Sequence, residues 1–129
     1  MIDLVEKFPT VFELSKNGEL GFFAGASYPE GWEAMVYSFC EWFSHYKEHR
    51  PDKNELYIQQ IKEKFGGLRI YPSLYDKEVE NVISFLEFQS FNTCEVTGKL
   101  GVLCIKNGWV KVLSEEARNM EDYKGYEPQ

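Results

Sequence analysis

A run of large apolar side chains between residues 30 and 48 constrains the fold of this chain more than any other feature. These side chains recur at three- and four-residue steps, and residues with that spacing share one face of an α-helix. Pro51 follows the run and limits the helix at its C-terminal end. We expect Trp32, Phe39 and Trp42 to anchor the core from this face. The members of the run are Trp32, Met35, Val36, Phe39, Trp42, Phe43 and Tyr46.

Residues 56–71 predict a β-hairpin that turns at Gly66 and Gly67. Two adjacent glycines between strand-like runs form a natural two-residue turn. Because side chains alternate between the faces of a strand, this register defines one apolar face and one polar face. The apolar face would hold Ile61, Phe65, Leu68 and Ile70. The polar face would hold Lys62, Lys64, Arg69 and Tyr71.

Two further patterns predict a second helix and an early turn. Residues 76–91 again carry apolar residues at helical steps. Near the N-terminus, Asn17-Gly18 between apolar runs indicates a hairpin or tight turn. The positions of the second helix that we expect to face inward are Val79, Val82, Ile83, Leu86 and, as a further candidate, Phe85.

The C-terminal third has the layout of a zinc ribbon that lacks its ligands. It contains a short knuckle, a hairpin that turns at Asn107-Gly108, and a second knuckle that opens a helix capped by Ser114. A working site needs thiolates or imidazoles at four corners, and here only Cys94 can ligate zinc. We therefore predict no metal and no cofactor. The corner positions are Cys94, Thr97, Ser114 and Ala117.

Together these patterns predict an α+β fold. Two amphipathic helices would pack on short antiparallel hairpins, and a degenerate zinc-ribbon-like hairpin with a short helix would follow. A chain of 129 residues can bury enough surface for a substantial core. We expect residues 1–129 to form a single domain.

Two segments resemble a family of small uncharacterised phage and bacterial proteins. Ile61–Tyr71 resembles the hairpin motif Lys-Glu-Lys-Phe-Gly-x-Leu-Arg of that family, and Ser90–Arg118 resembles its C-terminal knuckle pair. Gly31-Trp32 matches the pair that leads the first helix of family members. The family pattern C-x2-C…C-x2-H is kept here at Cys94 alone, so the resemblance implies no zinc in this chain. Its setting in phages and mobile elements implies an inhibitor, anti-defence or immunity role.

The charge balance disfavours several classes of partner. Fourteen Lys and Arg against 21 Asp and Glu give a net charge of −7, which disfavours nucleic-acid backbones and membrane surfaces. It favours a basic protein partner, or it serves solubility alone. No apolar run approaches the roughly 20 residues of a membrane span, and Met1–Lys7 lacks the basic region of a signal peptide. Three cysteines form no disulfide framework, so we expect a cytoplasmic protein.

The acidic C-terminal region is the first candidate for partner binding. Carboxylates interleaved with tyrosines can pair with Lys and Arg on a basic target, while the rings add contact area. The alternative is a solvated, fraying tail. The candidate residues are Glu115, Glu116, Glu121, Asp122 and Tyr123.

The polar face of the predicted hairpin is the second candidate. Residues 52–71 contain four Lys or Arg and three Asp or Glu, so the charge balance reverses to +1 in this segment. Such a strip suits an acidic partner or a nucleic acid, whereas the alternative is a charged strand edge that blocks aggregation. The candidate residues are Lys62, Lys64, Arg69 and Tyr71.

Catalytic and metal-binding patterns are sparse. Glu41, His45 and His49 lie at four-residue steps on the first predicted helix, where two imidazoles can chelate a metal. Their position opposite the apolar stripe favours a solvated polar face, and whether these residues bind a metal stays open. The sequence has no G-x-S-x-G, P-loop or G-x-G-x-x-G motif. We therefore do not expect an enzyme.

These observations favour a small acidic cytoplasmic binding protein that inhibits or neutralises a protein target with a basic surface. A toxin-immunity protein fits best, and a phage anti-defence inhibitor is the first alternative. A nucleic-acid-binding module that uses the basic hairpin at residues 60–71 is an alternative of another class, which the net charge disfavours.

Overall fold

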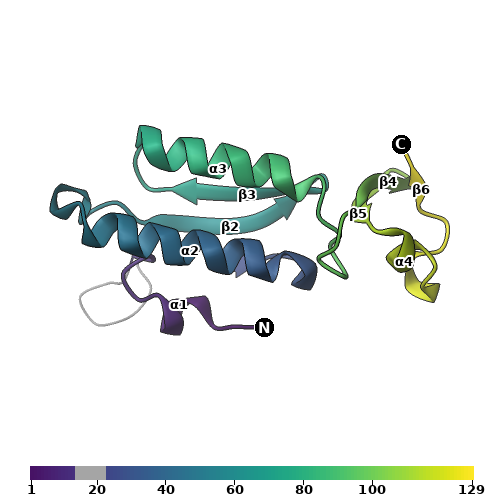
Figure 1. Cartoon of the computed structure of the whole chain (residues 1–129), viewed down its shortest axis with the longest axis horizontal. Helices are drawn as coiled ribbons and strands as arrows, with labels where there is room; N and C mark the ends of the chain where they lie inside the picture. Colours follow the sequence, from purple (N-terminus) through teal and green to yellow (C-terminus); the bar gives the residue numbers. More distant parts are fainter. Residues whose placement is uncertain (14–22) are drawn as a thin grey trace.

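The computed structural model of the chain describes residues 1–13 and 23–129, and it has the predicted α+β fold. The long helices pack beside the first of two small sheets. The second sheet lies at the end of the molecule where the C-terminus is found (Figure 1). The predicted turn at Asn17-Gly18 lies outside the described residues. No helix in the described ranges is both long and apolar enough to cross a membrane. The elements in chain order are α1 (Leu4–Lys7), β1 (Ala26–Ser27), η1 (Glu30–Trp32), α2 (Glu33–Glu48), η2 (Pro51–Lys53), β2 (Ile58–Lys64), β3 (Gly67–Pro72), α3 (Lys77–Ser90), β4 (Val102–Lys106), β5 (Trp109–Leu113), α4 (Glu115–Arg118), η3 (Glu121–Tyr123) and β6 (Glu127–Pro128).

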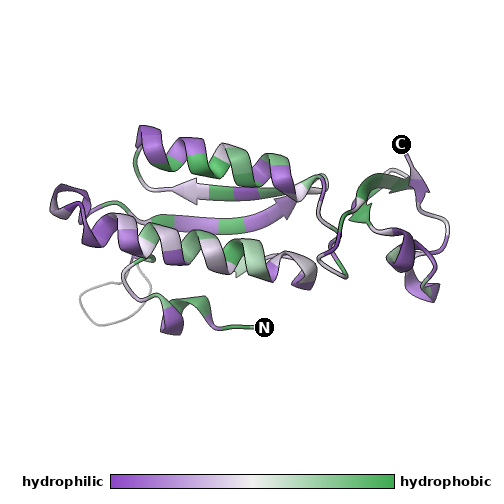
Figure 2. Cartoon of the chain, in the orientation of Figure 1, coloured by the Kyte–Doolittle hydropathy of each residue, from purple (hydrophilic) through white to green (hydrophobic). Residues whose placement is uncertain are grey.

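The first sheet has the strand order β1–β2–β3 and carries the larger core. β1 runs parallel to β2, and β2 and β3 form an antiparallel hairpin. Helices α2 and α3 run beside this hairpin (Figure 1). Phe39 of α2 and Ile83 of α3 belong to the same buried cluster as Ile61 and Leu68 of the strands. Hydrophobic and hydrophilic residues alternate along both helices, as Figure 2 shows, because each helix turns one face to this core.

The apolar stripes predict most of the buried helix faces. Trp42 is only partly buried, and it stacks on Tyr46 with 5.1 Å between the ring centroids. On α3, Val79 and Ile83 are buried, but Phe85 is 66% exposed and its expected inward position is wrong. Phe85 lies about 110° around the helix from the centre of the buried face. The fully or nearly buried members of the first stripe are Trp32, Met35, Val36, Phe39 and Phe43.

The β2–β3 hairpin turns one residue earlier than predicted, at Phe65 and Gly66. Both residues have positive φ angles, of 52° and 83°, which a two-residue turn matched to the strand twist requires. Lys64 consequently pairs with Gly67. Phe65 is 75% exposed at the tip of the hairpin, so its expected place in the core is wrong.

Gly67 is needed for packing and not for the turn. A Cβ atom at Gly67 would lie 2.6 Å from Cζ of Phe91. The predicted turn would pair Glu63 with Ile70, whereas the observed register pairs Ile61 with Ile70. A shift of two residues keeps every side chain on its predicted face. The other apolar residues of the hairpin are therefore buried as expected.

The second sheet has the strand order β5–β4–β6 and forms the C-terminal unit. Its hairpin turns at Asn107-Gly108, where the φ angles are 51° and 84°, as predicted. The backbone N–H of Ala117 donates a hydrogen bond to Oγ of Ser114 at 3.2 Å, so the predicted N-cap of α4 is confirmed. The chain end is ordered, because β6 pairs with β4 and the Gln129 N–H donates to the carbonyl oxygen of Leu103 at 2.9 Å. The interpretation as a fraying tail is therefore wrong.

Gly31 and Trp32 connect the start of α2 to the C-terminal unit through hydrogen bonds. The Gly31 N–H donates to the carbonyl oxygen of Glu95 at 2.8 Å, and the indole N–H of Trp32 donates to the carbonyl oxygen of Thr93 at 2.9 Å. A Cβ atom at Gly31 would lie 2.6 Å from the carbonyl carbon of Glu95 and still closer to the carbonyl oxygen of Cys94. The backbone of the C-terminal unit therefore occupies the space that a side chain at position 31 would need.

Candidate partner-binding site

The four corner positions of the ribbon frame come together as a hydrogen-bonded cluster. Sγ of Cys94 accepts hydrogen bonds from the backbone N–H groups of Val96 and Thr97, both at 3.3 Å. The hydroxyl groups of Thr97 and Ser114 lie 3.1 Å apart, and Ala117 is buried in the same apolar cluster as Cys94. Burial raises the pKa of the Cys94 thiol, but hydrogen bonds from Ser114 and Thr97 outweigh burial and bring it down to about 7.

The described residues do not assemble a conventional metal site. Within residues 1–13 and 23–129, no three or more His, Cys, Asp or Glu side chains group closely enough to hold a metal ion. Glu41 and His45 on α2, and His49 directly after its last residue, are exposed and form no such group. Cys104 is buried near Cys94, where its thiol donates to the carbonyl oxygen of Val102 at 3.3 Å.

We expect purified protein to contain no stoichiometric zinc, and we expect a chelator to leave its melting temperature unchanged. Three of the corner side chains cannot ligate zinc, and the thiol of Cys94 is already supplied with hydrogen bonds. Elemental analysis and melting curves with and without EDTA measure both expectations. One zinc ion per chain would contradict them.

A designed variant provides the matching positive control. The variant adds a thiolate at each of the three corner positions other than Cys94, through Thr97→Cys, Ser114→Cys and Ala117→Cys. We expect this variant to bind Co²⁺ with a tetrahedral absorption spectrum, and we expect a further Cys94→Ser change to weaken that binding. A variant that binds no cobalt would show that the corners do not converge on one point.

The basic strip of the hairpin is assembled as predicted, but one of its charges is already paired. Lys62 pairs with Arg69 across the two strands, and Nζ of Lys62 lies 6.0 Å from the centroid of the Tyr71 ring. The Arg69 guanidinium forms an ion pair with Glu87 at 3.0 Å. Lys62 and the exposed Lys64 are therefore the charges of the strip that remain available to a partner.

The acidic C-terminal residues lie on α4 and η3. Glu115, Glu116, Glu121 and Asp122 are exposed. Glu116 pairs with Lys99 at 3.1 Å and Glu121 pairs with Lys124 at 2.9 Å, and such exposed pairs contribute little to stability. Tyr123 instead packs on the cluster that contains Cys94 and Cys104. No hydrogen bond or ion pair among the described residues joins this acidic set to the basic strip.

An acidic cavity that the sequence did not reveal lies between the first sheet and the C-terminal unit. It has a volume of about 400 Å³. Three carboxylates and one ammonium group line it, and two tyrosines form part of its wall. These residues are Glu30, Glu63, Glu95, Lys111, Tyr28 and Tyr123.

Glu95 is the most deeply placed carboxylate of this cavity. It is 6% exposed, its Oε2 accepts a hydrogen bond from the Val112 N–H at 2.8 Å, and its Oε1 lies 3.6 Å from Nζ of Lys111. Burial raises the pKa of Glu95, although the Val112 N–H and Lys111 oppose this shift. Burial and the nearby carboxylate of Glu33 raise the pKa of Tyr28 to about 12. A cation that entered the cavity would therefore meet the neutral phenol group of Tyr28 beside the carboxylates.

The comparisons with known proteins provide no relative for this chain. No protein-family model, curated protein or solved structure matches it. The resemblance to small phage and bacterial proteins therefore stays a prediction.

Proposed function

We propose that the chain is a small binding protein that inhibits or neutralises a protein target with a basic surface. The acidic cavity is the observation that carries this proposal. Three carboxylates against one ammonium group leave a net negative charge in a space of about 400 Å³. A Lys or Arg side chain of a partner suits such a space, because its charged end pairs with carboxylates while its stem packs on tyrosine rings.

The exposed acidic residues of η3 support the same proposal. Tyr123 lines the cavity, and it follows Glu121 and Asp122 directly in the chain. Neither residue lines the cavity, and we infer from this adjacency that both carboxylates lie near its rim. Rim charges attract an oppositely charged partner over a distance and accelerate its association. The net charge of −7 adds to this attraction.

Within this proposal, a cytoplasmic toxin-immunity protein is the preferred assignment, and a phage anti-defence inhibitor is the alternative. Both would block a basic protein surface without catalysis or a cofactor. The identity of the target distinguishes them, because an immunity protein recognises a toxin and an anti-defence protein recognises a host defence factor. Affinity capture from extracts of the host provides that target for the measurements below.

Replacing Glu121 and Asp122 by Lys is expected to slow association with the captured target several-fold at low salt. Folding should be unaffected, because both side chains are exposed. Stopped-flow association rates at two salt concentrations measure the effect. Glu6→Lys with Glu41→Lys is the matched control, since it makes the same change in net charge on α1 and α2. If both variants slow association equally, the net charge of the protein sets the association rate and the position of Glu121 and Asp122 does not matter.

Replacing Glu30 and Glu63 by Gln is expected to raise the dissociation rate by about tenfold or more, because it leaves a buried basic side chain of the partner short of carboxylates. Oε2 of Glu63 accepts the Gly66 N–H at 2.8 Å, and the amide oxygen of Gln can keep that bond. Surface plasmon resonance gives the rate, and a melting curve checks the fold. An unchanged dissociation rate in a folded variant would rule out the cavity as the binding site.

A deletion of residues 121–129 cannot test the role of the acidic C-terminal residues, because it also removes β6, which completes the second sheet.

The nucleic-acid-binding alternative is favoured by one observation: a lysine charge lies beside an exposed aromatic ring, with Nζ of Lys62 6.0 Å from the centroid of the Tyr71 ring. Phosphate contacts impose a steep loss of affinity with rising salt. A salt titration of DNA and RNA binding, with Lys62→Glu and Lys64→Glu as the comparison variant, therefore tests this alternative. Steep, variant-sensitive binding would replace the proposal of a protein target.

A further inference from the structure

Lys47 is a buried lysine in the last turn of α2. Its side chain is 7% exposed, and no other lysine of the described residues is buried. Nζ donates a hydrogen bond to the carbonyl oxygen of Thr10 at 2.7 Å. The same nitrogen lies 3.8 Å from the centroid of the Tyr57 ring. Nζ also lies 5.9 Å from the centroid of the Phe43 ring. One carbonyl oxygen and two ring faces therefore surround an ammonium group that has three N–H donors.

Two other partly buried lysines, Lys53 and Lys111, are paired with buried carboxylates. Lys53 lies 3.1 Å from Asp76, and Lys111 lies 3.6 Å from Glu95. Lys47 forms no ion pair with any carboxylate in the described part of the chain. A buried charge without a counter-charge is costly, and burial accordingly lowers the pKa of Lys47 to about 8. An anion that reached Nζ would remove this cost.

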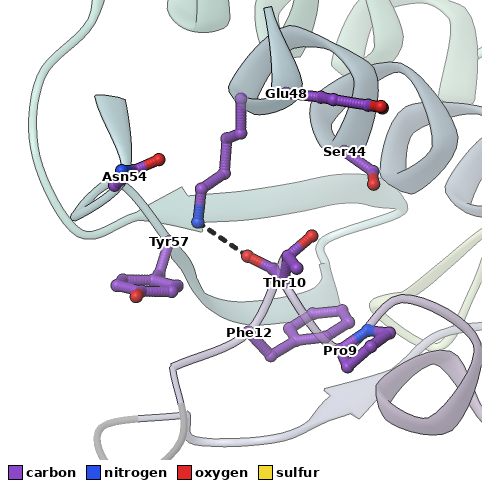
Figure 3. Close-up of a pocket in the computed structure, with 8 residues that line it drawn as sticks. Pro9, Thr10, Phe12, Ser44, Glu48, Asn54 and Tyr57 are labelled. Carbon is purple, nitrogen blue, oxygen red and sulfur yellow. Dashed lines mark hydrogen bonds between the residues drawn. The ribbon is translucent and has the colours of Figure 1, made fainter. Parts of the chain in front are cut away.

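Lys47 lines a cavity of about 520 Å³, which is within the range of small-molecule sites. Figure 3 shows the cavity between the end of α2, the segment that follows α1 and the segment that precedes β2. Tyr57, Phe12 and Pro9 supply apolar walls, and Thr10, Ser44 and Asn54 supply hydroxyl and amide groups. Glu48 also lines the cavity, but it is exposed.

We propose that this cavity binds a small organic carboxylate whose charged end pairs with Lys47 and whose apolar body lies against Tyr57 and Pro9. A single ammonium group matches a monoanion better than a phosphate dianion, and the nearby carboxylate of Glu48 disfavours further negative charge. The hydroxyls of Ser44 and Thr10 and the amide of Asn54 line the same cavity and can donate hydrogen bonds to the ligand. The site is independent of the partner surface proposed above.

The test uses benzoate as the probe and inorganic phosphate as the competing class of anion, with chloride keeping the ionic strength constant. We expect benzoate to shift NMR signals of the Tyr57 ring in a saturable manner. Lys47→Met removes the charge and keeps an apolar stem, and we expect it to weaken benzoate binding about tenfold or more. Lys77→Met is the matched control, because Lys77 is exposed on α3. We expect this control variant to bind benzoate as the wild type does.

Tyr57→Leu provides a second variant in case Lys47→Met does not fold. It keeps Lys47 and removes the ring from the wall, and we expect several-fold weaker benzoate binding. Absence of saturable benzoate binding in the millimolar range would overturn the proposal, as would unchanged binding in the folded variants. Phosphate binding as tight as benzoate binding would overturn the assignment to a carboxylate.

Discussion

Replacing Gly31 by Ala is expected to lower the free energy of unfolding by about 3 kcal/mol or more. The new Cβ atom would lie 2.6 Å from the carbonyl carbon of Glu95. That neighbour is backbone, which cannot move aside as a flexible side chain can. The displacement would also break the hydrogen bond from the Gly31 N–H to the Glu95 carbonyl oxygen, which is 2.8 Å long. Urea unfolding followed by tryptophan fluorescence gives the measurement.

Gly108→Ala is the matched control for this prediction. Gly108 has a positive φ of 84°, but nothing lies within 4 Å of a Cβ atom built there. This substitution therefore imposes backbone strain of about 1–2 kcal/mol without a steric clash. If Gly31→Ala loses no more stability than Gly108→Ala, the space between Gly31 and the backbone of Glu95 has room for a methyl group.

Replacing Phe39 by Ala is expected to lower the free energy of unfolding by about 3–5 kcal/mol. The ring is 1% exposed, and its centroid lies 5.7 Å from that of Phe43 and 6.1 Å from that of Trp42. Truncation removes these contacts and leaves a cavity at the centre of the larger core. The midpoint of urea unfolding reports the change.

Phe85→Ala is the control of the same residue type. Phe85 also lies on a helix, but it is 66% exposed, so its truncation should change stability by no more than about 0.5 kcal/mol. Similar effects at Phe39 and Phe85 would contradict both the assigned face of α2 and the corrected face of α3.

The sequence predicts the features whose causes lie within one segment. The burial of Phe39 follows from helical spacing alone, and the N-cap at Ser114 follows from the residues after it. The turn at Asn107-Gly108 is likewise local, because both residue types tolerate positive φ. These predictions succeed because no distant part of the chain changes the local preference.

The predictions that are wrong or missing have causes that lie in distant parts of the chain. The sequence pattern predicts Gly67 in the turn, whereas the ring of Phe91 requires a glycine there for packing. Phe65 then takes a positive φ that its residue type rarely adopts. The acidic cavity combines Glu30, Glu63 and Glu95 from three separate segments, and no spacing within one segment could indicate it. A list of exposed charges does not reveal which of them share a cavity.

The contact between Trp32 and Thr93 has a consequence for the order of folding during synthesis. The two residues are 61 positions apart, so the ribosome makes the whole β2–β3 hairpin and α3 before Thr93 becomes accessible to Trp32. The hairpin closes over a short loop, whereas this contact must close a long one at a higher entropic cost. The nascent chain should therefore hold a formed hairpin while the start of α2 still lacks its partner backbone. A pause in translation before residue 93 would prolong the exposure of the Trp32 indole.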